Sequence, residues 1–169
     1  LRAMHENFNF PVIFTRAANV YGKHQQLYRI IPKLILSALT GKKVPLEGGG
    51  KSIRSFINIS DVNTALDRIV LDGQVGETYH ISTNELISIH DLVVLICDRL
   101  NVNFSDLVEI APDRPGKDFA YQLDSSKIRT DLNWSDKMSL VEGIDETISW
   151  VVENLSELRE MPMNYIHRK

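Results

Sequence analysis

Three polar residues in this sequence stand where an anionic ligand could bind. Asn19 follows the apolar run FPVIFT, in the polar and aromatic stretch RAANVYGKH, which predicts a loop where a strand ends. Arg54 lies in a strand-like segment, and Arg114 lies in the turn-forming stretch DRPGK. Taken singly, each arginine is also typical of a solvent-exposed position. Because diphosphate oxygens match the guanidinium fork and their charges favour more than one cationic partner, the two arginines together predict a diphosphate site.

The sequence lacks the patterns of several other kinds of site. Its five histidines are scattered without metal-ligand spacing, and the single cysteine, Cys97, provides no sulfur cluster, so we expect no metal. The stretch GGGKS at 48–52 has Pro45 where the first glycine of a phosphate-binding P-loop would stand, so a hairpin turn is favoured. Asp113 and Asp118 could act as an acid and a base, but turns favour Asp for backbone reasons.

Hydrophobic periodicity predicts strands that alternate with helices. Strands are expected over 11–16, 44–47, 53–59, 77–82 and 107–111, and helices over 30–40, 60–72, 88–101, 125–132 and 139–155, after the last turns of another helix in 1–10. The run at 11–16 indicates a strand buried on both faces, as in a parallel sheet. Ser60 is expected to cap the helix over 60–72, with Leu66 and Val70 on its buried face. The fold class is therefore α/β or α+β, in one unit that the chain enters mid-fold.

The composition is that of a globular protein. The 169 residues are 43% hydrophobic and 24% charged, with a formal net charge of −3. Because like charges form no long block, we expect no binding to nucleic acid or to a membrane surface. The sequence contains no apolar run of the roughly 20 residues that span a bilayer. With a single cysteine, these features indicate a cytoplasmic protein.

Four segments together resemble the C-terminal half of the extended short-chain dehydrogenase/reductases that act on nucleotide sugars. They are RAANVYGKHQQLYRIIPKLILSAL, GGGKSIRSFINISDVNTAL, GETYHISTNE and DRPGKDFAYQLDSSKIRTDLNW, in that order. DRPGKD points to the dehydratase branch, with the dTDP-glucose 4,6-dehydratases as the closest resemblance. The resemblance implies the last strands of an NAD(P)-binding Rossmann-like sheet, from 10–20 and 53–82, plus a small mixed α/β substrate-binding domain. Residues 1–169 would form one unit without the N-terminal NAD-binding half.

The resemblance also implies where ligands bind. Val20 should lie near the nicotinamide of NAD, and Pro45–Glu47 beside the nucleotide base. The residues implied to contact a nucleoside diphosphate sugar are Asn19, Arg29, Ile30, Pro45, Leu46, Glu47, Arg54, Asn84, Asp113, Arg114 and Lys117. Three positions depart from the family pattern. Glu47 replaces an aromatic residue that would stack on the base, Lys23 replaces a proline, and Arg29 replaces a lysine.

The activity implied by the resemblance belongs to a longer protein. Such an enzyme oxidises the sugar at C4 with bound NAD, eliminates water across C5 and C6, and returns the hydride to C6. Its glycine-rich loop, its Tyr-x-x-x-Lys pair and its acidic residues lie in the other half, so we expect no catalytic residue here. A homodimer is expected for the full-length protein. The alternatives are a UDP-sugar epimerase or decarboxylase on the same scaffold, or a binding module without catalysis.

Overall fold

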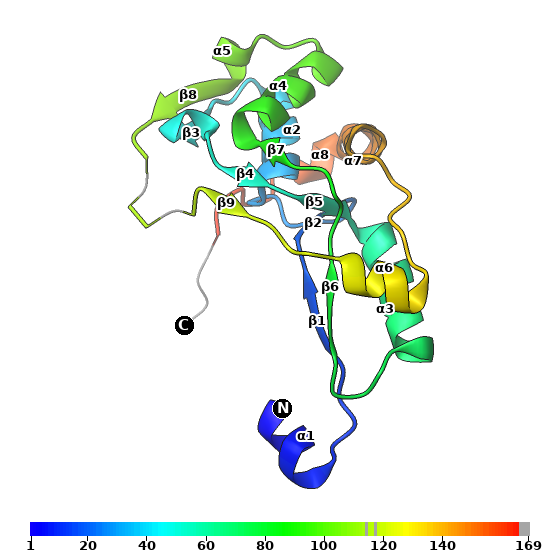
Figure 1. Ribbon diagram of the computed structural model, residues 1–169. Helices are drawn as coiled ribbons and strands as arrows, with labels where there is room; N and C mark the ends of the chain where they lie inside the picture. Colours follow the sequence, from blue (N-terminus) through cyan, green and yellow to red (C-terminus); the bar gives the residue numbers. More distant parts are fainter. Residues whose placement is uncertain (114, 117, 166–169) are drawn as a thin grey trace.

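The computed structural model describes residues 1–113, 115–116 and 118–165. Its helices and strands alternate along the chain (Figure 1). In chain order they are α1 (Arg2–Phe8), β1 (Phe14–Ala17), β2 (Asn19–Tyr21), α2 (Ile30–Thr40), β3 (Val44–Glu47), the 3-10 helix η1 (Gly48–Gly50), β4 (Ile53–Arg54), β5 (Phe56–Asn58), α3 (Ile59–Asp72), β6 (Thr78–Ile81), β7 (Ile87–Ser88), α4 (Ile89–Leu100), α5 (Phe104–Leu107), β8 (Val108–Ala111), β9 (Ala120–Tyr121), α6 (Ser126–Leu132), α7 (Leu140–Glu153) and α8 (Leu155–Leu158).

Most strand pairs are parallel and join segments that are far apart in the sequence. β1 pairs with β6, β2 with β5, and β3 with β8, all in parallel. β4 is antiparallel to β7 and parallel to β9. The hairpin predicted around the three glycines is therefore wrong, because β3 and β4 belong to different sheets. All three glycines have positive φ and form η1, which carries the chain from one sheet to the next.

Two hydrophobic cores hold these elements together. The first core lies among α2, α4 and α7, with the β3–β8 pair beside it. The second core lies among α3, α6 and the strands β5 and β6. The β2–β5 pair separates the two, because successive side chains of a strand point to opposite faces. Tyr21 and Phe56 enter the first core, whereas Val20 and Ile57 pack on the second.

The predicted helices are confirmed, and the structure adds the short helices α5 and α8, which the sequence did not predict. α2 covers the expected 30–40 and ends at Gly41, which has a φ of 65°. α3 begins one residue before the expected start, and its cap is Asn58, whose side-chain oxygen accepts a hydrogen bond from the Ser60 amide. Val70, expected on the buried face of α3, is 80% exposed. Leu66 is also exposed, so the buried stripe of this helix is narrower than its pattern predicts.

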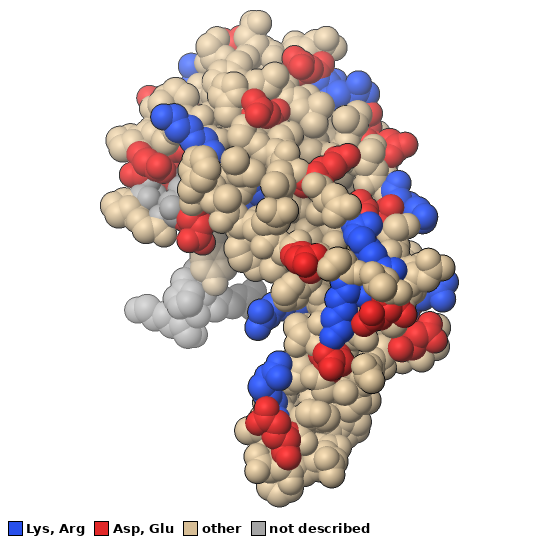
Figure 2. Space-filling view, viewed as in Figure 1, with Lys and Arg blue, Asp and Glu red and all other residues tan. Residues whose placement is uncertain are grey.

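The strand predicted over 11–16 is observed as β1, but its two faces are not buried. Thr15 and Arg16, in the middle of this strand, are exposed. β1 extends with α1 below the main body of the molecule, and its register partner is β6 (Figure 1). On the face seen in Figure 2, acidic and basic side chains are interspersed over the main body. Within the described part of the chain, no helix combines the length and apolarity that crossing a bilayer requires.

Candidate functional site

A hollow of about 870 Å³ opens where β2 ends. Its walls are β2, the loop from Gly22 to Arg29, the first residues of α2, and two residues from β5 and α3. The lining residues are Ala18, Asn19, Val20, Tyr21, Gly22, Lys23, His24, Gln25, Gln26, Tyr28, Arg29, Ile30, Ile31, Phe56 and Ile59. Because β2 and β5 are parallel, their carboxyl ends meet at this edge, which is where ligands bind in open α/β sheets.

The chain leaves β2 through a glycine that a larger residue could not replace without strain. Gly22 has a φ of 147°, which side chains rarely adopt. A Cβ atom at this position would lie 2.7 Å from Cγ2 of Ile59, at the start of α3. The glycine therefore lets the loop turn close against α3 and leaves the hollow open above the strand.

Asn19 is held by the residue that precedes β5. Its backbone amide and its side-chain Nδ2 both donate to the carbonyl oxygen of Ser55, at 3.1 and 3.0 Å. The hydroxyl of Ser55 is buried and contacts Oγ of Ser82 at 3.0 Å and Oγ1 of Thr83 at 3.1 Å. Asn19 is thus fixed by a hydrogen-bonded cluster, and its side-chain oxygen remains able to accept a hydrogen bond from a ligand.

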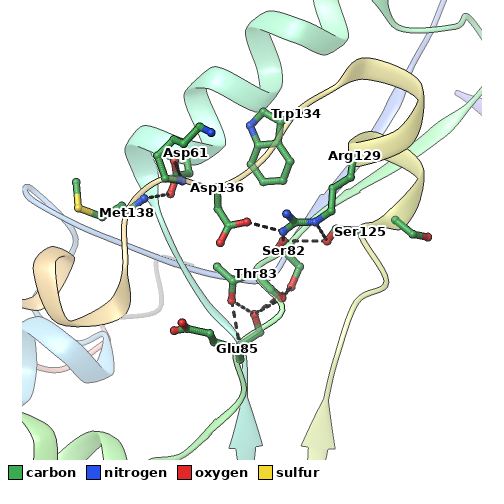
Figure 3. Close-up of polar contacts among 12 residues, drawn as sticks. Asp61, Ser82, Thr83, Glu85, Ser125, Arg129, Trp134, Asp136 and Met138 are labelled. Atoms are coloured by element: carbon green, nitrogen blue, oxygen red, sulfur yellow. Dashed lines mark hydrogen bonds and ion pairs between the residues drawn. The ribbon is translucent and has the colours of Figure 1, made fainter.

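The cluster around Ser82 continues into the segment that follows α6 (Figure 3). The carbonyl oxygen of Ser82 accepts from Oγ of Ser125 at 3.0 Å and from Nη2 of Arg129 at 2.9 Å. Arg129 also pairs with Asp136 at 2.5 Å, and its guanidinium lies 5.3 Å from the ring centroid of Trp134. These contacts tie the end of β6 to the chain that leads into α7.

Three loop residues line the hollow although the sequence did not identify them as site residues. Nε2 of Gln25 donates to the carbonyl oxygen of Val20 at 2.6 Å, which holds the loop over β2. Lys23 forms an ion pair with Glu146 of α7 at 2.8 Å, and His24 lies 5.2 Å from the ring of Trp150. A sequence signal that could have identified Lys23 as a site residue is its position directly after Gly22, the glycine that follows β2.

The electrostatics of the hollow favour an anion. Lys23 and Arg29 line it, and none of the described residues on its wall is acidic. This contrasts with the formal net charge of −3 for the whole chain. α2 also begins at this wall, and the side chain of Arg29, its N-cap residue, forms no capping hydrogen bond. Of the first three residues of α2, Ile30 and Ile31 carry amide N–H groups and Pro32 does not, and the positive end of the helix dipole lies at this wall.

The structure brings together four of the residues predicted from the sequence and places the others that it describes elsewhere. Asn19, Val20, Arg29 and Ile30 all line the hollow. Arg54 does not line it, because its guanidinium donates to the carbonyl oxygens of Ile53, Asp118 and Phe119. Three hydrogen bonds leave two of the five guanidinium N–H donors for a ligand. Arg54 therefore holds the 118–119 backbone on β4, and its predicted ligand contact stays a prediction.

Four of the remaining predicted residues lie around β3 and η1. Pro45, Leu46 and Glu47 lie on β3, and Glu47 is the register partner of Ala111 on β8. The Asp113 carboxylate lies against Gly48, where an added Cβ would be 2.5 Å from its Cγ. Asn84 is exposed at a bend after β6. Arg114 and Lys117 lie outside the described residues, so the predicted convergence of two arginines remains a prediction. No cluster of potential metal ligands occurs among the residues the structure describes.

The family of the chain is shown by a model described as GDP-mannose 4,6 dehydratase, which matches residues 1–147. The chain belongs to this family. The dTDP-glucose 4,6-dehydratase of Escherichia coli is 35% identical over 164 residues, which cover 91% of this chain and 45% of that protein. The chain thus spans about half the length of this relative and matches its C-terminal half.

Solved structures confirm the predicted fold. The dTDP-glucose 4,6-dehydratase of Streptomyces venezuelae, with NAD and TYD bound, has a TM-score of 0.88 at 30% identity. The match covers 92% of this chain and 48% of that chain. A UDP-glucose 4-epimerase of Thermotoga maritima, with UDP-glucose, has a TM-score of 0.84 at 24% identity over 90% of this chain and 50% of that one. This second likeness shows the fold alone. The fold of the dehydratase family is thus the mixed α/β fold of extended short-chain dehydrogenase/reductases.

Proposed function

We propose that the hollow at the end of β2 binds the diphosphate and sugar of a nucleoside diphosphate sugar. The observation that carries this proposal is that Lys23, which also forms an ion pair with Glu146 of α7, and Arg29 both line a wall without an acidic side chain among its described residues. Asn19, fixed by the carbonyl oxygen of Ser55, can accept a hydrogen bond from a sugar hydroxyl. The chain would thus form the substrate side of an NAD-dependent nucleotide-sugar 4,6-dehydratase, the activity named for its relatives.

In this reaction the residues described here bind and orient the substrate. Lys23 and Arg29 would neutralise diphosphate charge, and the positive end of the α2 dipole would add to this attraction. Val20 fits the neighbourhood of a nicotinamide, because it lines the hollow with an apolar side chain that packs on the second core. NAD, when bound, supplies the oxidation of the sugar at C4 and the later reduction at C6. Holding the sugar in one orientation beside Val20 is the contribution of this chain.

Isothermal titration calorimetry with dTDP and UDP tests the binding proposal. Arg29→Ala is expected to weaken binding about tenfold, since it removes one charge-assisted contact of about 1.4 kcal/mol. Lys23→Ala should have a smaller effect, because the ion pair with Glu146 already offsets part of the charge of Lys23. Arg68→Ala is the matched control, because Arg68 is an exposed cation of α3 outside the hollow, paired only at 3.7 Å with Asp72. Equal affinities in the Arg29 and Arg68 variants would contradict the proposal.

The reaction itself is tested by its product. Incubation of the full-length protein with dTDP-glucose and NAD, followed by NMR, should reveal a 4-keto-6-deoxy sugar. A C4 epimer with its C6 hydroxyl retained would instead support the epimerase alternative. The absence of any turnover by a protein that binds the sugar nucleotide would support the non-catalytic binding module.

We also propose that the full-length protein is a cytoplasmic homodimer in which 10–20 and 53–82 lie at the edge of an NAD-binding sheet. Exposed apolar residues in α1 and at the end of α3 support a covering layer in the longer protein, since Phe8 is 73% exposed and Leu71 is 76% exposed. The relatives are about twice as long as the chain, which leaves room for such a layer. Light scattering and limited proteolysis of the full-length protein test the dimer and the single unit over 1–169.

A further inference from the structure

Tyr21 ends β2 in the wall of the hollow, but its hydroxyl points away from the ligand side. The residue is only 2% exposed, and its hydroxyl donates to the carbonyl oxygen of Leu140 at a long 3.5 Å. A Cβ atom added at Gly143 would lie 2.1 Å from that hydroxyl oxygen. Tyr21 therefore reaches the backbone of α7 only because position 143 carries no side chain.

Asn58 meets Tyr21 and α7 at the same place. Its side-chain oxygen caps α3, and its Nδ2 atom would lie 2.9 Å from a Cβ added at Gly143. This Nδ2 atom is buried and has no hydrogen bond of good geometry in the described part of the chain. Burial raises the pKa of the Tyr21 hydroxyl, and the Asn58 amide beside it partly offsets the rise. The ends of β2 and β5 thus converge on a point of α7 where no side chain fits.

The same face of α7 supports the rest of the loop wall. Gly143, Glu146 and Trp150 are spaced at i, i+3 and i+7, which places them on one side of a helix. Glu146 forms the ion pair with Lys23, and Trp150 packs against His24. Consecutive turns of α7 therefore contact the wall of the hollow from residue 21 to residue 24.

We propose that Gly143 is a positioning residue for the binding site. Because position 143 has no side chain, the Tyr21 ring can approach the backbone of α7 closely. This distance determines the positions of Asn19 and Lys23 on the wall of the hollow. This inference rests on the proposed function only in naming the ligand, because the seating of Tyr21 is a property of the folded chain. A methyl group at 143 must push Tyr21 toward the hollow or push α7 outward. Either shift displaces the wall, since the ion pair with Lys23 comes from the same helix.

Gly143→Ala tests the proposal in the full chain, with the double variant Tyr21→Phe/Gly143→Ala as the rescue. Gly143→Ala should weaken binding of dTDP or UDP about tenfold, the scale of one overpacked side chain. Removing the hydroxyl of Tyr21 relieves the shortest contact of the new methyl group, but Cζ of the ring and Nδ2 of Asn58 would still lie 2.8 and 2.9 Å from it, so the double variant should recover part of the lost affinity. Ser149→Ala is the matched control on α7, because this residue is exposed and lies off the wall, and it should bind normally.

The outcomes separate this inference from the proposed function. If the unchanged protein binds and Gly143→Ala binds equally well, the positioning role is overturned and the binding proposal stands. Failure of the double variant to recover affinity would also overturn it, because a general loss of helix packing is not relieved by a smaller side chain on β2. If the unchanged protein binds neither nucleotide, the proposed function fails, and hydrogen exchange over 22–28 decides the inference. Faster exchange in Gly143→Ala that is reversed in the double variant supports it, and unchanged exchange overturns it.

Discussion

Asp61 of α3 holds the segment that leads into α7, and its removal should destabilise the fold. Its carboxylate is 3% exposed and accepts hydrogen bonds from the backbone amides of Lys137 at 2.9 Å and Met138 at 3.1 Å (Figure 3). Asp61→Ala leaves both amides without this partner. Hydrogen bonds to a charged group contribute about 1.5 to 3 kcal/mol each. Because Lys137 is exposed and water can reach its amide, we expect a loss near the lower end, about 3 kcal/mol in the free energy of unfolding.

Urea unfolding measures this loss as a lower midpoint at an unchanged slope. Asp61→Asn should lose about half as much, roughly 1.5 kcal/mol, because one side-chain oxygen still accepts while the new amide faces an N–H donor. Asp67→Ala is the matched control, since Asp67 is an exposed residue of the same helix, and it should change stability by less than about 0.5 kcal/mol. If Asp61→Ala and Asp67→Ala unfold at the same urea concentration, the two hydrogen bonds do not anchor this segment.

Three further predictions concern other parts of the site. Gly22→Ala should cost about 2 kcal/mol in urea unfolding, because of its φ of 147° and the approach of Ile59, and a neutral result would mean that the loop turns without strain. Arg129→Ala should cost about 2 kcal/mol in the same assay, since it removes the pair with Asp136, and Arg129→Lys should restore only part of this loss. Tyr21 keeps its proton in the folded state, where burial raises its pKa, whereas the unfolded chain loses that proton above about pH 10. Stability should therefore be full below pH 10 and fall above it by up to about 1.4 kcal/mol per pH unit, and an equally steep fall in Tyr21→Phe would contradict this.

The sequence predicted the helices well because their signals are local. α2 was placed from Pro32 in its first turn and Gly41 after its last, and both serve those purposes in the structure. Strand pairing was less predictable, because the residues between 44 and 59 favour strands and a turn without saying which strands they join. β7 and β9 have two residues each, which is too short for any alternation to show.

The site was partly predictable for a related reason. Asn19 was predicted because it follows an apolar, strand-like run, although it begins β2 instead of lying in the expected loop. Arg29 was predicted only from the family resemblance, and it is the N-cap residue of α2. Lys23 and Gln25 were not predicted as site residues, because their positions depend on contacts made by the folded loop. Lys23 pairs with Glu146, and Gln25 donates to the carbonyl oxygen of Val20, and no local sequence pattern indicates either contact. Arg54 was predicted to contact a ligand because a cation is unusual inside a strand. In the structure its guanidinium instead donates hydrogen bonds to three backbone carbonyl oxygens, which the sequence pattern did not indicate.

The two cores have different consequences for the hollow. α3 and the segment after α6 both pack in the second core. Asp61 of α3 accepts hydrogen bonds from the amides of Lys137 and Met138, and these bonds fix the segment that leads into α7. α7 belongs to the first core and contacts the loop wall through one face. A change at Asp61 should therefore reduce stability and affinity together, since it loosens α7 as a whole. A change at Gly143 should reduce affinity more for each kcal/mol of stability that it costs, because the added Cβ overlaps Tyr21 of the wall itself, although such overpacking also destabilises the fold by about 1 to 3 kcal/mol. The ratio of lost affinity to lost stability, measured in the Asp61 and Gly143 variants, therefore distinguishes a residue that supports the fold from one that positions the binding site.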